Sequence, residues 1–487
     1  MMNGRMGFPA VVLTGFLWAC GNTSVSGLDL ATVDGLDAAV EETFQDLGPD
    51  APKAPVVVDE DFRFLYGYAG RIPGDNLGDF DFFYADPTDA DTSNDMSLTE
   101  NSLSDLSLDC HLGCFLDRGM RWMAIASEEG QDGTYTVKLA RFTTGLKLVS
   151  MDKFGALENV KHLAFAGDFL YFSQPQECEA QGGIPVPCYI IKRLDLNKPG
   201  TVQSLLTMPT KDLIQKAQGY QYYGYFTVGE DLKTLLFLLP TNVSQSVWVW
   251  RDGKLIKVVD DLCAARDLVG NCIGSGTSSL YHDNDPAALS PDGKHVVFAL
   301  VEDNADLRLY RHEIETDQTG FSVLMGVPSD YYTNACYNRA PWQYTSVGNP
   351  MRFTHDGSEV MFIGSHSCGD NKQKPWTNIV RLALDRIGSG EKLTEADFRK
   401  VTDNPEGHLA KAIAVSWFDL SPSGEYTVFA GTPTIEEDGS ALIKDTSARH
   451  YKDAEIYVTR TDGTTLPVQL TNRLEWEAVS VLAIPTP

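Results

Sequence analysis

The chain reads LSPDGKHVVFAL at Leu289–Leu300. Within this stretch Pro291-Asp292-Gly293 is a tight-turn signal, because proline fixes φ, aspartate bonds its own backbone and glycine accepts a positive φ. The β-branched and aromatic residues Val296–Phe298 follow the turn and favour a strand. The stretch therefore predicts a tight turn that leads directly into a β-strand.

The same pattern recurs along the chain. Near copies read MRFTHDGSEVMFIG at Met351–Gly364 and DLSPSGEYTVFAG at Asp419–Gly431, and a weaker copy reads TVGEDLKTLLFLL at Thr227–Leu239. The turn glycines at positions 293, 357 and 424 stand 64 and 67 residues apart. A period of this size, built from short strands, predicts an all-β chain folded as a single β-propeller.

The composition excludes some partners. The chain has 487 residues, of which 43% are hydrophobic and 10% aromatic, which suits a large core. Its 39 Lys and Arg residues face 67 Asp and Glu residues, so the formal net charge is −28. Such a surface repels nucleic acid and anionic lipid headgroups. We therefore expect no nucleic-acid partner. The simplest role of the negative charge is to keep the protein soluble.

The N-terminus has the features of an export signal. Arg5 precedes an apolar run at Phe8–Trp18 that is too short to span a membrane as a mature helix. The run ends in LWAC at positions 17–20, which resembles the bacterial lipobox. This resemblance implies cleavage before Cys20 and acylation of its thiol, and Gly21 implies sorting to the outer membrane of a two-membrane cell. An ordinary secretory signal with an incidental cysteine is the alternative.

Three segments follow from this pattern. Residues 1–19 are predicted as a lipoprotein signal peptide and 60–487 as the β-propeller. Residues 20–59 lie between them, are rich in Asp, Ala, Gly and Thr, and are predicted as an acidic flexible tether. The propeller would then touch the membrane only through its lipid.

The chain has nine cysteines, and acylation of Cys20 would leave an even eight in an exported protein. We expect disulfides between sequential neighbours, because such bridges need no crossing of blades. Closure of the longest loop should contribute about 3 kcal/mol. A zinc site is disfavoured, because there is no CxxC motif. The expected pairs are Cys110–Cys114, Cys178–Cys188, Cys263–Cys272 and Cys336–Cys368.

The repeats resemble those of TolB-type propellers. In that family a blade reads roughly SPDG, an apolar strand, an Ile-Tyr-Val strand, Asp-Gly and Leu-Thr. Ser290–Gly293 and Ser421–Gly424 match the opening, and Ile456–Val458, Asp462-Gly463 and Leu470-Thr471 match the close. The resemblance covers roughly residues 60–487 and implies the propeller fold, but it implies little about activity.

The repeats predict seven blades, with six as the alternative. Six full units lie between about residue 110 and Thr471. Phe62–Tyr68 and Asp79–Tyr84, with Ser97–Thr99, look like a blade without its innermost strand. The C-terminal Ala478–Pro485 echoes Ala414–Pro422, 64 residues earlier. Because unpaired strands leave open backbone edges, we expect this echo to pair with Phe62–Tyr68 and close the ring as a blade shared by both chain ends. The next strands are expected at Arg121–Ser127, Tyr135–Phe142, His162–Phe165, Phe169–Ser173, Tyr189–Leu194, Gly224–Val228, Thr234–Leu239, Val247–Trp250 and Leu255–Val259.

No catalytic motif is found. A propeller that serves an α/β-hydrolase domain would need the nucleophile elbow G-x-S-x-G, which neither IGSGT around Ser275 nor IGSHS around Ser365 provides. HExxH, GxGxxG, P-loop and EF-hand patterns are absent as well. The sequence favours a non-catalytic protein. It leaves open a hydrolase or lyase at the central channel, with His282, Asp283 and Asp285 as its candidate groups.

Aromatic and polar residues gather in the loops expected to enter the innermost strands. Such loops share one rim of a propeller, and an aromatic rim with a few charges suits a peptide or a small ligand. The alternative is that these residues pack between blades. Asp283 with Asp285, or the stretch Asp75–Asp95, would suit calcium, and no other cofactor is expected. The rim residues are Tyr220, Tyr222, Tyr223, His282, Asp283, Asp285, Trp342, Tyr344, His408 and Lys411.

Together these patterns predict a function. We expect a monomeric, lipid-anchored propeller of the cell envelope, which binds an envelope protein or a small ligand through its rim loops. A hydrolase or lyase is the alternative from a different class, and a lipoprotein with a purely structural task is the third.

Overall fold

The computed structural model divides the chain into two units, Met1–Pro52 and Lys53–Pro487. The first unit, with Cys20 and the predicted signal peptide, lies outside the described residues. The structure describes residues 55–70, 79–88, 96–97, 121–129, 134–143, 148–179, 183, 185–198, 200–210, 224, 226–240, 245–259, 287–301, 306–326, 343–344, 351–366, 376–402, 413–433, 455–471 and 476–485.

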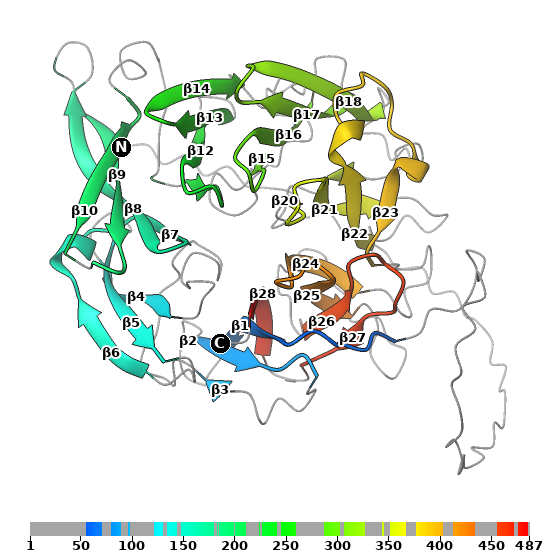
Figure 1. The fold of residues 1–487 in the computed structure, drawn as a ribbon, viewed down its shortest axis with the longest axis horizontal. Helices are drawn as coiled ribbons and strands as arrows, with labels where there is room; N and C mark the ends of the chain where they lie inside the picture. The colour runs from blue at the N-terminus through cyan, green and yellow to red at the C-terminus, as the bar shows by residue number, and fades with distance from the viewer. Residues whose placement is uncertain are drawn as a thin grey trace, which may run out of the picture. The chain divides into compact units, whose positions relative to one another are not determined.

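The described residues of the second unit form seven antiparallel sheets, which follow one another around a common centre in Figure 1. Their only helical elements are three short 3₁₀ turns, η4 (Gly155–Leu157), η5 (Leu384–Arg386) and η6 (Glu395–Asp397). The prediction of an all-β, single β-propeller is therefore confirmed. Six sheets have four or five strands, which matches the six-blade alternative, and the seventh has three described strands. The count of seven blades stays a prediction.

The strands are numbered in chain order and belong to the sheets as follows. The closing sheet, named for the two chain ends that it joins, holds β28 (Trp476–Pro485), β1 (Phe62–Gly70), β2 (Asp79–Ala85) and β3 (Met96–Ser97). The three-stranded sheet holds β4 (Trp122–Glu129), β5 (Tyr135–Phe142) and β6 (Leu148–Lys153). The next two hold β7 (His162–Ala166), β8 (Phe169–Glu179), β9 (Pro185–Asp195) and β10 (Val202–Met208), then β11 (Thr227–Val228), β12 (Thr234–Pro240), β13 (Gln245–Arg251) and β14 (Lys254–Val259).

Three further sheets complete the order. The first holds β15 (Ala287–Leu289), β16 (His295–Val301), β17 (Asp306–Glu313) and β18 (Gln318–Gly326). The second holds β19 (Gln343–Tyr344), β20 (Arg352–Phe353), β21 (Glu359–His366), β22 (Trp376–Ala383) and β23 (Phe398–Lys400). The last blade holds β24 (Ile413–Leu420), β25 (Tyr426–Pro433), β26 (Glu455–Arg460) and β27 (Val468–Gln469).

The repeated motif forms the tight turn between the first two strands of a sheet. Gly293, Gly357 and Gly424 have φ values of +66°, +71° and +78°, where a side chain would be strained. Their amides donate to the carbonyls of Ser290, Thr354 and Ser421 at 2.8–2.9 Å. The turn predicted from the sequence is thus present in three successive sheets.

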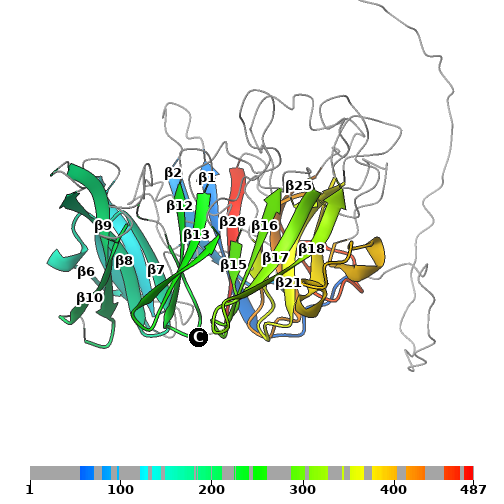
Figure 2. The ribbon, with the colours of Figure 1, turned by 90° about the horizontal axis from the view of Figure 1, so that it is seen from above.

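Antiparallel pairing gives each sheet two different ends. The turns from first to second strand and from third to fourth strand lie at one end, which we call the turn end. The connections from second to third strand, and from each sheet to the next, lie at the opposite end, which we call the loop end. Figure 2 shows the strands of neighbouring sheets running between the same two ends.

The core lies between neighbouring sheets rather than inside any one of them. Phe362 packs with Val297 and Leu309 of the preceding sheet, and Phe418 packs with Met361 and Ile379. Both phenylalanines are fully buried. Because a buried phenylalanine contributes about 1.5–3 kcal/mol, each sheet depends on its neighbours for stability.

Arginines of the third strands add polar links at the turn end. Arg251 of β13 donates to the carbonyl of Gly293 in the next sheet. Arg311 of β17 donates to the Leu384 carbonyl at 3.0 Å, and Arg381 of β22 donates to the Thr461 carbonyl at 2.9 Å. One arginine in each of three successive sheets therefore holds the backbone of the following sheet.

The two ends of the described chain pair with each other. β1 and β28 are antiparallel, from Phe62 opposite Pro485 to Gly70 opposite Trp476, with one irregularity at Gly67/Tyr68. This is the strand pair expected from the C-terminal echo. That the pair closes a ring of seven blades stays a prediction.

Candidate binding face

The loop end receives the connections from second to third strand and from sheet to sheet, which range in length from residues 241–244 to residues 260–286. Between second and third strands these are residues 180–184, 241–244, 302–305, 367–375 and 434–454. Between sheets they include residues 260–286, 327–342 and 403–412. At the turn end, short hydrogen-bonded turns join the first and second strands of three sheets, although the connection from β22 to β23 runs from residue 384 to 397. We take the loop end as the candidate binding face, because surface loops on a rigid scaffold commonly carry binding residues.

The predicted rim residues belong to these connections, and the structure leaves them untested. Tyr344 alone is within the described backbone, where it lies in β19 and pairs with Gly364 of β21. The others lie outside the described residues. They are Tyr220, Tyr222, Tyr223, His282, Asp283, Asp285, Trp342, His408 and Lys411.

His162, at the loop end of the inner strand β7, is a described residue of the inner rim that the sequence analysis did not select. Its Nε2 donates to the Phe226 carbonyl at 2.9 Å, and its ring meets the Phe226 ring edge-on with centroids 4.9 Å apart. The side chain is 7% exposed. His162 therefore joins two neighbouring sheets, which is the packing role given above as the alternative for rim residues.

The hairpin of β8 and β9 is longer than its neighbours at the loop end. β8 pairs with β9 from Phe169 to Glu179, whereas β7 pairs with β8 only from Phe169 to Ser173. On the other side, β10 covers β9 only from Tyr189 onward. Residues 174–179 and 185–188 therefore form a two-stranded extension, which we call the arm.

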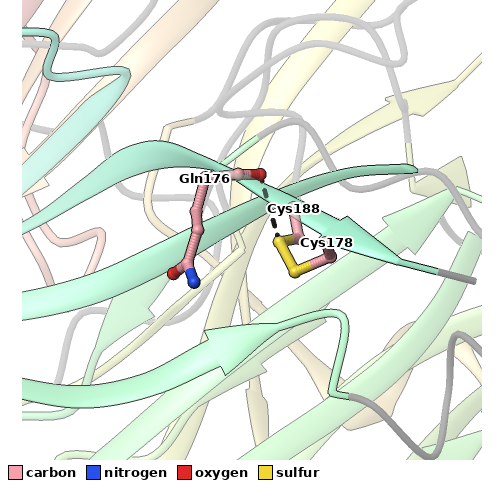
Figure 3. Close-up of a disulfide and its surroundings, with 3 residues drawn as sticks. All are labelled: Gln176, Cys178 and Cys188. Carbon is pink, nitrogen blue, oxygen red and sulfur yellow. Dashed lines mark hydrogen bonds between the residues drawn. A yellow bond between two sulfur atoms is a disulfide. The ribbon is translucent and has the colours of Figure 1, made fainter. Parts of the chain in front are cut away.

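A disulfide between Cys178 and Cys188 links the two strands of the arm, with Cα atoms 6.0 Å apart (Figure 3). The Cys188 Sγ also lies 3.2 Å from the Gln176 carbonyl oxygen. We regard this as a contact rather than a hydrogen bond, because a bridged sulfur has no hydrogen to donate. The expected Cys178–Cys188 bridge is thus present, and the six cysteines of the other three expected pairs lie outside the described residues.

The surface of the arm is polar and rich in proline. Pro175, Pro185 and Pro187 are exposed, as are Glu177 and Glu179. Proline has no N–H to offer a neighbouring strand, so these positions disfavour edge-to-edge pairing with another chain. The arm is therefore suited to side-chain contacts.

The described residues hold no group of three or more His, Cys, Asp or Glu side chains that could bind a metal. Of the stretch Asp75–Asp95, residues 79–88 are described. There Asp86 accepts from the Thr88 amide at 2.8 Å and lies 2.9 Å from Arg63. Asp86 is therefore engaged in local structure, while Asp283 and Asp285 lie outside the described part of the chain.

Two histidines, one buried and one partly buried, lie away from the candidate face. His312 of β17 is 1% exposed, its Nδ1 is 2.9 Å from the Thr319 hydroxyl, and burial lowers its pKa although Asp317 opposes the shift. Burial likewise lowers the pKa of His295, at the turn end of β16. Both rings are therefore neutral near pH 7 and belong to the turn end.

No protein-family model and no curated protein matches the sequence. Similar solved structures include one from a study of two prolyl endopeptidases, at 13% identity and a TM-score of 0.44, over 83% of this chain and 48% of that one. They also include TolB from Agrobacterium tumefaciens, at 12% identity and a TM-score of 0.35, over 69% and 92% of the two chains. TolB from Acinetobacter baumannii matches at 12% identity and a TM-score of 0.25, over 72% and 82%.

The strand pairing places the chain among the β-propellers, and TolB proteins are among its structural neighbours. The chain spans about half the length of the prolyl endopeptidase. At such low identity these likenesses concern the fold alone. Within the described ranges no helix is long and apolar enough to cross a membrane.

Proposed function

We propose that this protein is a binding module of the cell envelope that captures a protein or a small ligand at the loop end of its propeller. The difference between the two ends of the sheets carries the proposal. At the turn end, hydrogen-bonded turns join the first and second strands, and arginines of the third strands bond the backbone of the next sheet. The loop end carries the arm and receives the longest connections between sheets, to which the predicted rim residues belong by sequence.

The contacts of Val56 and Glu60 with the last blade also support the loop end as the binding face. The Val56 amide donates to the Leu466 carbonyl at 3.2 Å, just after the turn between β26 and β27. The Ser423 amide, in the turn between β24 and β25, donates to the Glu60 carboxylate at 2.9 Å. Both contacts lie at the turn end, so residues 55–60 do not cover the loop end.

We further propose that the propeller has seven blades, closed by the pairing of β1 with β28. The three-stranded sheet supports this through the direction of its strands. Arg121, before β4, pairs with Asp168 in the first turn of the next sheet at 2.8 Å, and Tyr135, which begins β5, pairs with Val160 before β7. Thus β4 starts at the turn end, as a second strand does, and the segment before it, residues 98–120, is long enough to supply a first strand.

Site-specific photocrosslinking in intact envelopes tests the binding proposal. A crosslinking residue at Trp342 or Tyr222 should give one recurrent adduct, while the same residue at Lys294, exposed in a turn at the turn end, serves as the control. Adducts from position 294 alone, or equally from all three positions, would overturn the loop-end assignment. Turnover of a small substrate that Trp342→Ala abolishes, without any adduct, would instead favour the hydrolase or lyase.

The lipid anchor has its own test. Cys20→Ser should move the protein from the membrane fraction to the soluble fraction, with loss of the acyl mass on the N-terminal peptide. A wild-type protein without acyl mass, together with an unchanged distribution of the variant, would show that the anchor is wrong while leaving the loop-end proposal intact.

A further inference from the structure

The turns of the repeat share one carboxylate contact. In the first of them, the Asp292 carboxylate accepts from the Ser290 hydroxyl at 2.7 Å and from the Lys294 amide at 3.0 Å. In the second, Asp356 accepts from the Thr354 hydroxyl at 2.7 Å in the same way. An aspartate at the third turn position therefore bonds the hydroxyl at the first position.

The turn of the last blade has no aspartate at that position, because Ser423 stands there. Glu60, which precedes β1, occupies the place instead. Its carboxylate accepts from the Ser421 hydroxyl at 2.6 Å, from the Ser423 amide at 2.9 Å and from the Ser423 hydroxyl at 2.6 Å. A carboxylate from the other end of the chain thus makes the hydroxyl bond that the aspartate makes in the two earlier turns.

The residues before Glu60 continue the attachment to the last blade. The Asp59 amide lies 3.1 Å from the Tyr426 hydroxyl, which in turn donates to the Asp59 carboxylate. Arg460 lies over the Tyr426 ring, 5.1 Å from its centroid, and reaches Asp59 at 3.5 Å. Arg460 ends the third strand of its sheet, as Arg251 does, but its partner is the N-terminal segment rather than a following sheet.

We propose that residues 55–60 form a strap that fastens the closing sheet to the last blade, with Glu60 as the missing turn carboxylate. The strap leads directly into β1, where the Phe62 ring stacks on Tyr426 with centroids 6.0 Å apart. When Glu60 binds, it orders the last turn and the entry to β1 together. When it is released, both lose their partner, so the strap controls how firmly the two sheets are held.

This inference makes a prediction about pairs of substitutions. Glu60→Ala removes the carboxylate. Ser423→Asp supplies one from within the turn, as in the two earlier turns, but places it beside Glu60, where like charges repel. The same Ser423→Asp change should therefore destabilise the protein that has Glu60 and stabilise the protein that lacks it.

The experiment compares thermal unfolding and amide exchange of the full chain for wild type, Glu60→Ala, Ser423→Asp and the double variant. Each single variant should lower the melting temperature by about 2 °C, and exchange at residues 421–426 should rise about tenfold. The double variant should recover most of the lost melting temperature and most of the lost protection from amide exchange. Asp61→Ala, which removes a neighbouring exposed carboxylate paired with Arg63 at 3.1 Å, is the matched control and should change neither reading.

The coupling between the two positions decides the outcome. A double variant more stable than either single variant supports the strap. Losses that add, or a double variant less stable than either single one, would overturn the assignment of Glu60 as the turn carboxylate. A Glu60→Ala protein with unchanged exchange at residues 421–426 would do so as well.

Discussion

At the residue scale, Asp419 is a buried carboxylate that contacts the inner strands of two neighbouring sheets. It is 2% exposed, accepts from the Ala483 amide of β28 at 3.0 Å and lies 3.6 Å from Arg352 of β20. Asp419→Ala should cost about 3 kcal/mol of unfolding free energy, because it leaves a buried amide and a partly buried guanidinium without this partner. Asp419→Asn keeps an acceptor oxygen and should cost less. Equal denaturation midpoints for wild type and Asp419→Ala would contradict this role.

The strap should also respond to pH through Asp59. The hydrogen bond from the Tyr426 hydroxyl, helped by Arg460, holds the pKa of Asp59 below its ordinary value of 3.8, although desolvation opposes the shift. A lowered folded-state pKa means that this stabilisation is present above about pH 4 and is lost as pH falls through the folded-state pKa. The difference in denaturation midpoint between wild type and Asp59→Asn should therefore be largest near pH 7 and shrink in acid. A difference that does not change with pH would contradict it.

At the element scale, the disulfide should act on the arm alone. Closing its loop, with a sequence separation of 10, restricts the unfolded arm by an amount equivalent to about 2–3 kcal/mol. Because the arm has no third strand, its loss should appear as local fraying. In a Cys178→Ser/Cys188→Ser variant, amide exchange should rise at residues 174–188 and stay unchanged in the β12–β13 hairpin, with little change in melting temperature. A large fall in melting temperature would show that the arm supports the core.

The comparison of sequence with structure is clearest for these elements. The turns were predictable, because Pro-Asp-Gly and its variants specify their geometry locally. The strands at His162–Phe165 and Leu255–Val259 agree with β7 and β14 to within a residue. The arm was not predicted, because the expected strands ended at Ser173 and began again at Tyr189, and the segment between them contains Pro175 and Pro187. The outer edges of this two-stranded ribbon pair with no further described strand, so a proline there costs no inter-strand hydrogen bond.

At the scale of the whole molecule, the strap is the feature that the sequence could not reveal. Residues 55–59 were assigned to the flexible tether on composition alone. Their bonds reach Tyr426, Arg460 and Leu466, several hundred residues away, and no local pattern records such contacts. The candidate binding face could be predicted only in part. Composition selected its rim residues, but no spacing in the sequence determines how such long loops fold.

The pairing of β1 with β28 leads to the prediction for the whole ring. Ala483 and Ile484 are 1% and 0% exposed, and the Ala483 amide is bonded to Asp419 of the last blade. Deleting Ala478–Pro487 would uncover the inner edge of β1 and leave Asp419 buried without that donor, so backbone groups of two sheets would lose their partners. We expect the melting temperature to fall by about 5 °C or more, with loss of cooperative unfolding or aggregation. Deleting Thr486–Pro487 alone is the control and should melt as wild type does. If the longer deletion also melts cooperatively at the wild-type temperature, the pair does not close the ring, and six blades with an appended N-terminal hairpin describe the molecule.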